Sequence, residues 1–295
     1  MGLGRVRRKV SLIVAREVFA GEEKQTVNHY ERNSVALNDS GGDSLDLLDE
    51  ILDTLLDGWV TSVLIGLHWT AVMAEVGGQR RCGLASTLSG PHRHHGQADV
   101  PQAGQLEIRS GAALAALAKA DQPTQASVGV AAINALLPQL PEAWVDLNAE
   151  EVLAREGAGK RVALIGHFPF VDGLHSRVGE LSVLEQRPQP GDLPASAAAE
   201  ILPQAEVVAI SGTTVINHTL EGLLALCSEE AMIILLGPST PLSPVLFDHG
   251  VDLLCGSVVT DIEAVLRVAG QGGNFRQVRR AGVRTVTMAR PGYDG

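Results

Sequence analysis

Four loops in the second half of the sequence carry residue types that bind small molecules, and each follows a short apolar run. Glycine lets the backbone approach a ligand closely, while serine, threonine, asparagine and histidine offer hydrogen-bonding groups. Glycine and hydroxyl groups at the start of a helix also favour an anionic ligand, because the first N–H groups of a helix are free. The candidate ligand-binding residues in these loops are Gly166, His167, Phe168, Glu185, Gly212, Thr213, Thr214, Asn217, Gly237, Pro238, Ser239 and Thr240.

The first loop, residues 166–170, stands where a dinucleotide-binding protein would carry the pattern GxGxxG. Only Gly166 of that pattern is present, and proline and aromatic residues replace the others, which weighs against a standard NAD site. Glu185 ends the next apolar run, 19 residues after Gly166, where an acidic side chain can bind ribose hydroxyls. Acids are common at strand ends, so Glu185 is a candidate contact to ribose or to another hydroxyl group.

Two of the loops also have a purely structural interpretation. Thr213 can cap the helix that follows it, and the loop from Gly237 to Leu242 can be a tight turn held by two prolines. His167 and His218 are candidate general acids or bases, because imidazole titrates near neutral pH, although His218 can equally be a packed helix residue. No GxSxG, Walker A, HExxH or kinase pattern occurs, which disfavours the common hydrolases and phosphotransferases.

Three histidines, His92, His94 and His95, lie close together in a segment rich in loop-forming residues. Imidazoles at this spacing can bind a divalent metal, but a stable site usually needs three or four ligands in fixed geometry. Asp99 is the nearby candidate for another ligand. The segment is therefore either a metal site or a solvated loop.

The first half of the chain predicts an α+β arrangement. Leucines at helical spacing predict a helix from Ser44 to Gly58, and runs rich in β-branched residues predict an antiparallel meander. Two more helices follow, and the second is apolar enough to be buried, with Asn134, an amide within its apolar run, as a candidate ligand contact. The predicted strands are 60–67, 69–76 and 80–88, and the predicted later helices are 105–119 and 125–137.

The second half alternates short apolar runs with helical segments, which is typical of βαβ crossovers and a parallel sheet covered on both faces. Ligands bind such sheets outside the carboxyl ends of the strands, so the four loops should meet at one edge. The run at 283–288 is expected to add an edge strand. The predicted strands are 161–166, 181–185, 206–211, 231–237 and 251–259, and the predicted helices are 196–202, 214–227 and 261–269.

Composition restricts the class of protein. The 295 residues carry a net charge of −11 and are 45% hydrophobic, which fits a globular protein and disfavours nucleic-acid binding. Three dispersed cysteines and apolar runs shorter than the ~18 residues of a membrane helix lead us to expect a cytoplasmic protein. Residues 1–43 differ in composition and are expected to form a poorly ordered extension, or a short amphipathic helix packed on the body.

Five segments carry a resemblance to a known family: GLHWTAV (66–72), SVGVAAINAL (127–136), VALIGHFPFV (162–171), ISGTTVINHTLEGLL (210–224) and LLGPSTPLSP (235–244). Over residues 44–288 the chain resembles the bacterial and archaeal proteins described as having a heavy-metal chelation domain. The resemblance implies an α/β fold with an enolase N-terminal-like α+β domain, 44–145, followed by a Rossmann-like parallel-sheet domain, 146–295. It also implies a site in the cleft between the domains and a role with metals or metal chelates, including tetrapyrroles or corrinoids.

Three hypotheses for the function follow. The leading one is a protein that binds a small anionic or metal-chelating ligand between its domains, with a divalent heavy metal or a nucleotide-like molecule as candidate cofactor. The second is an enzyme that uses NAD or S-adenosylmethionine at the same sheet edge. The third is a non-catalytic metal carrier that uses the segment from His92 to His95. We expect neither nucleic acid nor membrane as a partner, and a homodimer is compatible with the sequence.

Overall fold

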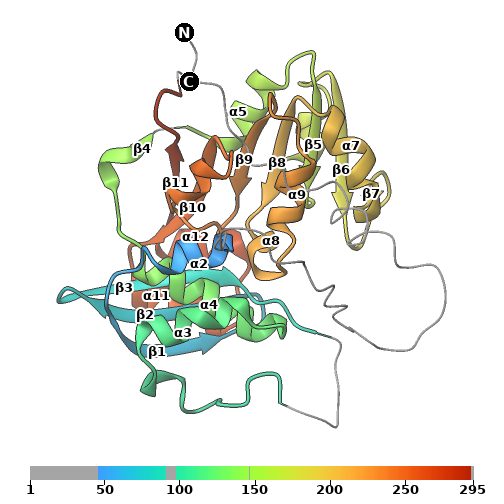
Figure 1. The fold of residues 1–295 in the computed structure, drawn as a ribbon. Helices are drawn as coiled ribbons and strands as arrows, with labels where there is room; N and C mark the ends of the chain where they lie inside the picture. Colours follow the sequence, from blue (N-terminus) through green and yellow to red (C-terminus); the bar gives the residue numbers. More distant parts are fainter. Residues whose placement is uncertain (1–45, 91–97, 146, 294–295) are drawn as a thin grey trace, which may run out of the picture.

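The computed structural model describes residues 46–90, 98–145 and 147–293, and Figure 1 shows them as two β-sheets with helices packed around them. The predicted N-terminal extension, 1–43, lies outside these residues. The fold is of mixed α/β class, as predicted, with a small antiparallel sheet and a large, mainly parallel sheet. No helix within the described ranges is long and apolar enough to cross a bilayer.

The small sheet is the predicted antiparallel meander. Its strands are β1 (Trp59–Ile65), β2 (Trp69–Val76) and β3 (Gln79–Ser86). Helix α4 (Pro123–Leu136) covers one face and is buried almost throughout, as its apolar sequence predicts. Helix and sheet approach each other so closely at Gly83 that a methyl group there would overlap the α4 backbone at Ala131 and Ala135.

The other face of the small sheet is covered by helices from the far end of the chain. These helices are α11 (Ile262–Gly270) and α12 (Phe275–Gly282). Trp69 and Leu84 of the sheet share a hydrophobic cluster with Val265 and Val278 of the helices. The Trp69 Nε1 group also donates a hydrogen bond of 3.0 Å to the Gly273 carbonyl. The small sheet is therefore the middle layer of a helix–sheet–helix stack, and residues beyond the predicted domain boundary at 145 complete it.

The large sheet has eight strands. In spatial order they are β4 (Trp144–Val145), β11 (Val283–Ala289), β10 (Leu253–Val259), β9 (Met232–Leu236), β8 (Val207–Ser211), β5 (Arg161–Ile165), β6 (Glu180–Glu185) and β7 (Leu193–Pro194). Strands β5 to β10 pair in parallel, as predicted. The expectation of an edge strand at 283–288 is wrong, because β11 pairs antiparallel with β10 on one side and with β4 on the other.

Several predicted helices are shorter than expected. The helix predicted from Ser44 to Gly58 is α2 (Leu47–Leu52), and the one predicted at 105–119 is divided into a 3-10 turn, Leu106–Ile108, helix α3 (Gly111–Ala115) and the 3-10 turn Ala116–Lys119. Ser110 causes the division, since its hydroxyl accepts the Ala113 N–H and begins α3 there. The large sheet is covered by α5 (Ala149–Glu156), α6 (Val171–Leu174), α7 (Ala198–Ile201), α8 (Thr213–Ile216), α9 (Leu220–Leu226) and α10 (Val245–Asp248).

The helix predicted at 214–227 is interrupted at Asn217, His218 and Thr219, between α8 and α9. The Asn217 side-chain oxygen accepts hydrogen bonds from the backbone N–H and the hydroxyl of Thr219, which competes with a continuous helix. His218 adopts a left-handed conformation, with a φ of 60°. Such a φ is uncommon outside glycine and is energetically unfavourable. The packing around the loop must therefore offset this conformational free energy.

One hydrophobic core connects the two sheets. Ile133 and Leu136 of α4 belong to the same cluster of buried side chains as Ile210 of β8 and Val215 of α8. Helices α2 and α8 lie between the sheets (Figure 1). The space between the two halves is therefore largely filled by apolar packing, and only limited hollows remain for a ligand.

Candidate functional site

The carboxyl ends of β5, β8 and β9 bring three of the predicted loops together. Gly166 and Gly237, which follow β5 and β9, have φ angles of 109° and 117° that favour glycine. A methyl group on Gly166 would lie 3.1 Å from the Ser211 Cβ atom, and the Gly212 N–H donates to the Leu236 carbonyl at 2.7 Å. The chain leaves β5 for β6 on one side and later returns to β8 on the other, so this edge is a topological switch point. We call it the carboxyl edge.

His167 in the first loop is held by a buried carboxylate that the sequence analysis missed. Its Nδ1 atom lies 3.1 Å from each carboxylate oxygen of Asp192, whose side chain is only 3% exposed. Asp192 also accepts the Gln189 N–H at 3.0 Å, which fixes the carboxylate at the turn before β7. A proton on Nδ1 satisfies this contact, and Nε2 makes no hydrogen bond to any described residue. The sequence signal was weak, because Asp192 is one acid in a polar turn.

Glu185 shapes the first loop from within. One carboxylate oxygen accepts the His167 N–H at 2.8 Å and the other accepts the Gln186 N–H at 3.0 Å. The ribose contact stays a prediction, but both carboxylate oxygens of Glu185 already accept backbone N–H groups. Phe168 stacks on Phe170 with ring centroids 5.3 Å apart and planes within 6°. The first loop thus presents an oriented imidazole beside a rigid aromatic pair.

The third loop supplies paired hydroxyl groups. The Ser211 and Thr213 hydroxyls lie 2.8 Å apart, and the Thr214 hydroxyl donates to the Ser211 carbonyl at 2.7 Å. Thr214 is buried, while Ser211 and Thr213 remain partly exposed. Asn217 holds the turn between α8 and α9, as described above. Of the predicted residues in this loop, Thr213 is best placed to meet a ligand at the carboxyl edge.

The fourth loop connects the two sheets. Ser239 and Thr240 are each 1% exposed, and the Ser239 hydroxyl accepts the Ser86 N–H of β3 at 2.9 Å. A methyl group on Gly212 would lie 2.6 Å from the Thr240 amide nitrogen, so the third and fourth loops touch. The Pro238 carbonyl accepts a bond from the Ser257 hydroxyl. These contacts give Ser239 and Thr240 a structural role, while Gly237 and Pro238 remain partly exposed.

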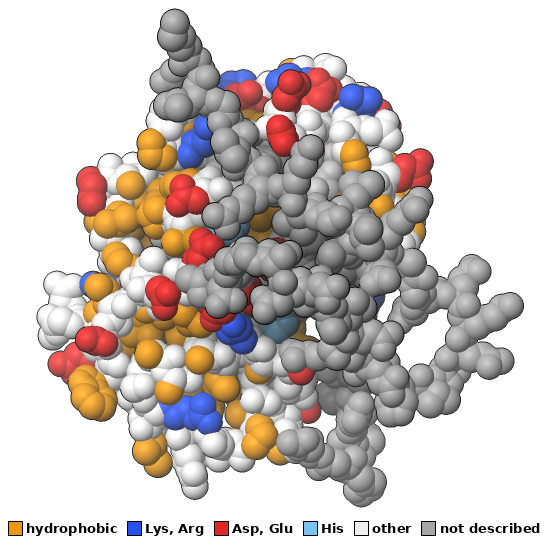
Figure 2. All heavy atoms as spheres, viewed as in Figure 1, with side chains coloured by type: hydrophobic (Ala, Val, Ile, Leu, Met, Phe, Trp, Pro, Cys, Tyr) orange, Lys and Arg blue, Asp and Glu red, His pale blue; other side chains and the backbone are white. Residues whose placement is uncertain are grey.

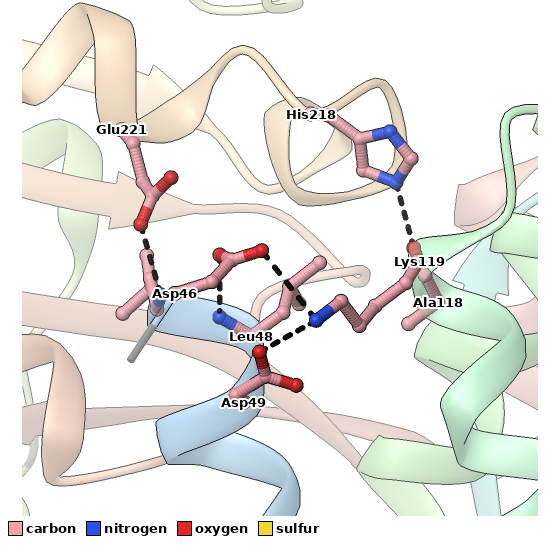
Figure 3. Close-up of polar contacts among 8 residues, drawn as sticks. Asp46, Leu48, Asp49, Ala118, Lys119, His218 and Glu221 are labelled. Carbon is pink, nitrogen blue, oxygen red and sulfur yellow. Dashed lines mark hydrogen bonds and ion pairs between the residues drawn. The ribbon is translucent and has the colours of Figure 1, made fainter. Parts of the chain in front are cut away.

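A hollow of about 230 Å³ separates α2 from the loop between α8 and α9. Figure 3 shows its polar wall, where the Lys119 ammonium lies between the carboxylates of Asp46 and Asp49. The hydrogen bond to Asp49 raises the pKa of Lys119. His218 Nε2 contacts the Ala118 carbonyl at 2.7 Å, and Thr214 also lines the hollow. The polar side chains of this wall are thus engaged with one another or with backbone groups.

A second, much smaller hollow of about 30 Å³ lies where β3, α4 and the fourth loop meet. It brings together two predicted residues, Asn134 and Thr240, with Cys82 and Trp144. The Asn134 side-chain amide donates to the Leu84 carbonyl at 2.9 Å and so joins α4 to β3. The volume admits about two waters rather than a larger ligand.

Comparison with known proteins places this architecture in a family. Two family models, each described as "putative heavy-metal chelation", match residues 48–137 (DUF4213) and 148–288 (DUF364). The uncharacterized protein MJ0500 of Methanocaldococcus jannaschii is 30% identical over 232 residues, 76% of this chain and 86% of that protein. The chain belongs to the family that these two models describe.

Solved structures of the family share the fold. The crystal structure of a protein of unknown function from Desulfitobacterium hafniense is 30% identical and superposes with a TM-score of 0.71, covering 83% of this chain and 98% of that one. A second structure, from Pyrococcus horikoshii, is 23% identical with a TM-score of 0.68 and covers 82% of this chain and 98% of that one. At 23% identity, the second structure shows only that the two proteins share a fold.

The description of the two family models directs attention to groups that could hold a metal ion. The described residues contain no cluster of three or more His, Cys, Asp or Glu side chains suited to hold an ion. The predicted ligands His92, His94 and His95 lie outside the described residues. Figure 2 shows Asp and Glu side chains spread over the visible face rather than gathered at one point.

The three cysteines are poor metal ligands in the folded chain. Burial raises the pKa of Cys82 to about 12 and that of Cys255 to about 11, and Cys227 is buried as well. Since the thiolate is the reactive form, we expect dithionitrobenzoate at about pH 8 to react slowly with the native protein and rapidly with all three thiols in guanidinium chloride. Rapid reaction of the native protein would show that a thiolate is accessible.

Proposed function

We propose that this chain binds a small anionic molecule that chelates a heavy metal, at the carboxyl edge of the large sheet. The observation that carries the proposal is the meeting of Gly166, Ser211 and Gly237 beside His167, whose ring is oriented by Asp192. Carboxyl edges at a switch point are the usual ligand sites of open parallel sheets. The family's description supplies the metal-chelating character of the ligand.

The edge has the groups that an anion needs. The Ser211 and Thr213 hydroxyls lie 2.8 Å apart, so one donates to the other and the pair keeps one proton to donate to an anion. The N–H groups of Gly166, Gly212 and Gly237 already donate to backbone carbonyls. Helix α8 has only four residues, so its dipole adds little. The expected anion contact is therefore the Ser211–Thr213 hydroxyl pair.

The two other hypotheses gain no support of their own from the described residues. A nucleotide cofactor would need Glu185 to contact ribose, yet both of its oxygens accept backbone N–H groups. A metal carrier based on His92, His94 and His95 depends on residues outside the described part. The chelate-binding function is thus the one that we retain, because the description of the family models supports it.

Replacing Thr213 with valine is expected to weaken ligand binding about tenfold, because a hydrogen bond to a charged group is lost. Affinity would be measured by calorimetry, with the ligand chosen from metal chelates, tetrapyrroles, nucleotides and free divalent metals by the rise in melting temperature. Thr61→Val is the matched control, since Thr61 is exposed on β1. The proposal fails if none of these classes stabilises the protein, or if both variants bind equally.

A further inference from the structure

We propose that His167 supplies one ligand, through Nε2, to a divalent metal that arrives already held by a chelating molecule. The inference rests on the function proposed above and adds how the protein contacts the metal. It follows from the contacts and the exposure of the His167 imidazole at the carboxyl edge. In this account the buried Asp192 carboxylate orients that imidazole.

The Asp192 carboxylate determines which nitrogen of His167 is available. Both carboxylate oxygens lie 3.1 Å from Nδ1, so the proton of a neutral imidazole belongs on Nδ1 and the lone pair on Nε2. Histidines that bind metals typically donate their other ring N–H to a carboxylate, which orients the ring and raises its basicity. The His167–Asp192 pair has this arrangement.

The pair is rigid on one side and accessible on the other. Asp192 is 3% exposed and is also tied to the Gln189 N–H, whereas the His167 side chain is 27% exposed. Nε2 has no hydrogen-bond partner among the described residues. The imidazole therefore offers an oriented lone pair to an incoming group at little cost in ordering.

A single imidazole cannot fill the coordination of a divalent metal, which takes four or more ligands. The remaining ligands must then come from the molecule that carries the metal. The edge suits such a complex, because the Ser211–Thr213 hydroxyl pair can donate to an anionic group while the stacked Phe168 and Phe170 form an apolar wall. Protein recognition of the chelator and of the metal would thus use different residues.

The test uses the copper(II) complex of iminodiacetate, a chelator that leaves coordination positions open. The full chain carries His92→Ala, His94→Ala and His95→Ala, because neighbouring histidines would capture copper by themselves. Imidazole 15N resonances are recorded during titration, and the His167 signal is the one missing from His167→Gln. Paramagnetic broadening then reports which histidine contacts the metal, with no assay of activity required.

We expect the His167 resonance to broaden at the lowest ratio of complex to protein, ahead of the exposed His175 and of His249. His249 is the matched control, because it is 28% exposed and contacts the Glu50 carboxylate at 2.9 Å through its Nε2. Asp192→Asn should raise the ratio needed at His167 at least about tenfold, the usual effect of losing such a carboxylate. Thermal unfolding of each variant would confirm that it folds.

Broadening of His167 no earlier than His175 would overturn the inference, and so would an unchanged response in Asp192→Asn. These results are distinct from a failure of the proposed function. If His167→Gln binds a metal chelate as tightly as the parent chain while Thr213→Val does not, the edge binds the chelator and His167 does not contact the metal.

Discussion

Gly129→Ala is expected to lower the free energy of unfolding by about 3 kcal/mol or more, the upper range for overpacking a rigid core. Gly129 lies in α4, where a methyl group would overlap the backbone of Leu117 and Ala118. Backbone atoms cannot rotate away as a side chain can, so the helix must move. Because α4 packs on the small sheet and contacts α8, its movement would loosen both halves. Urea unfolding followed by circular dichroism would measure the loss.

Gly222→Ala is the matched control for this variant. Gly222 lies within α9, and a methyl group there would have no heavy atom within 4 Å. Alanine favours a helix over glycine by up to about 1 kcal/mol, so this variant should be neutral or slightly more stable. Equal stabilities for the two variants would contradict the close approach at α4.

Asp252→Ala should cost about 3 kcal/mol, since it breaks an ion pair whose carboxylate is buried and leaves a backbone N–H in the sheet without its acceptor. The Asp252 side chain is 3% exposed, accepts the Ile233 N–H at 2.8 Å and lies 2.6 Å from Arg290 Nε. It joins β9, β10 and the end of β11 at the amino edge of the large sheet. Because the carboxyl edge is not altered, ligand affinity should be preserved in the folded fraction.

The control for the Asp252 variant is a surface ion pair. Arg80 and Glu263 lie 2.7 Å apart, but their side chains are 59% and 66% exposed. Glu263→Ala should therefore change stability by less than about 1 kcal/mol. A loss at Asp252 no larger than this would show that burial does not strengthen the contact.

The strands and their meeting edge were predictable because local patterns determine them. Apolar runs of five to seven residues alternate with helical segments, and parallel pairing then brings their carboxyl ends to one side. The positive φ at Gly166 and Gly237 agrees with glycine at the ends of β5 and β9. These features need only neighbouring residues and the general rules of βαβ connection.

Long-range partners were not predictable from the sequence. Asp192 binds His167 from 25 residues away, and α11 and α12 cross to the small sheet, which no periodicity reveals. The loop of Ser239 and Thr240 had the composition of a ligand contact, yet packing against β3 buried it. Hydroxyl groups can bind a ligand or make buried hydrogen bonds between elements of the fold, so residue type alone could not separate these two roles.

The most direct test of the central claim is a crystal structure of the chain soaked with the chelate that stabilises it most. We predict ligand density at the carboxyl edge, in contact with Gly166, Thr213 and His167. Density instead in the 230 Å³ hollow beside Lys119 and His218, with the carboxyl edge free, would contradict the account.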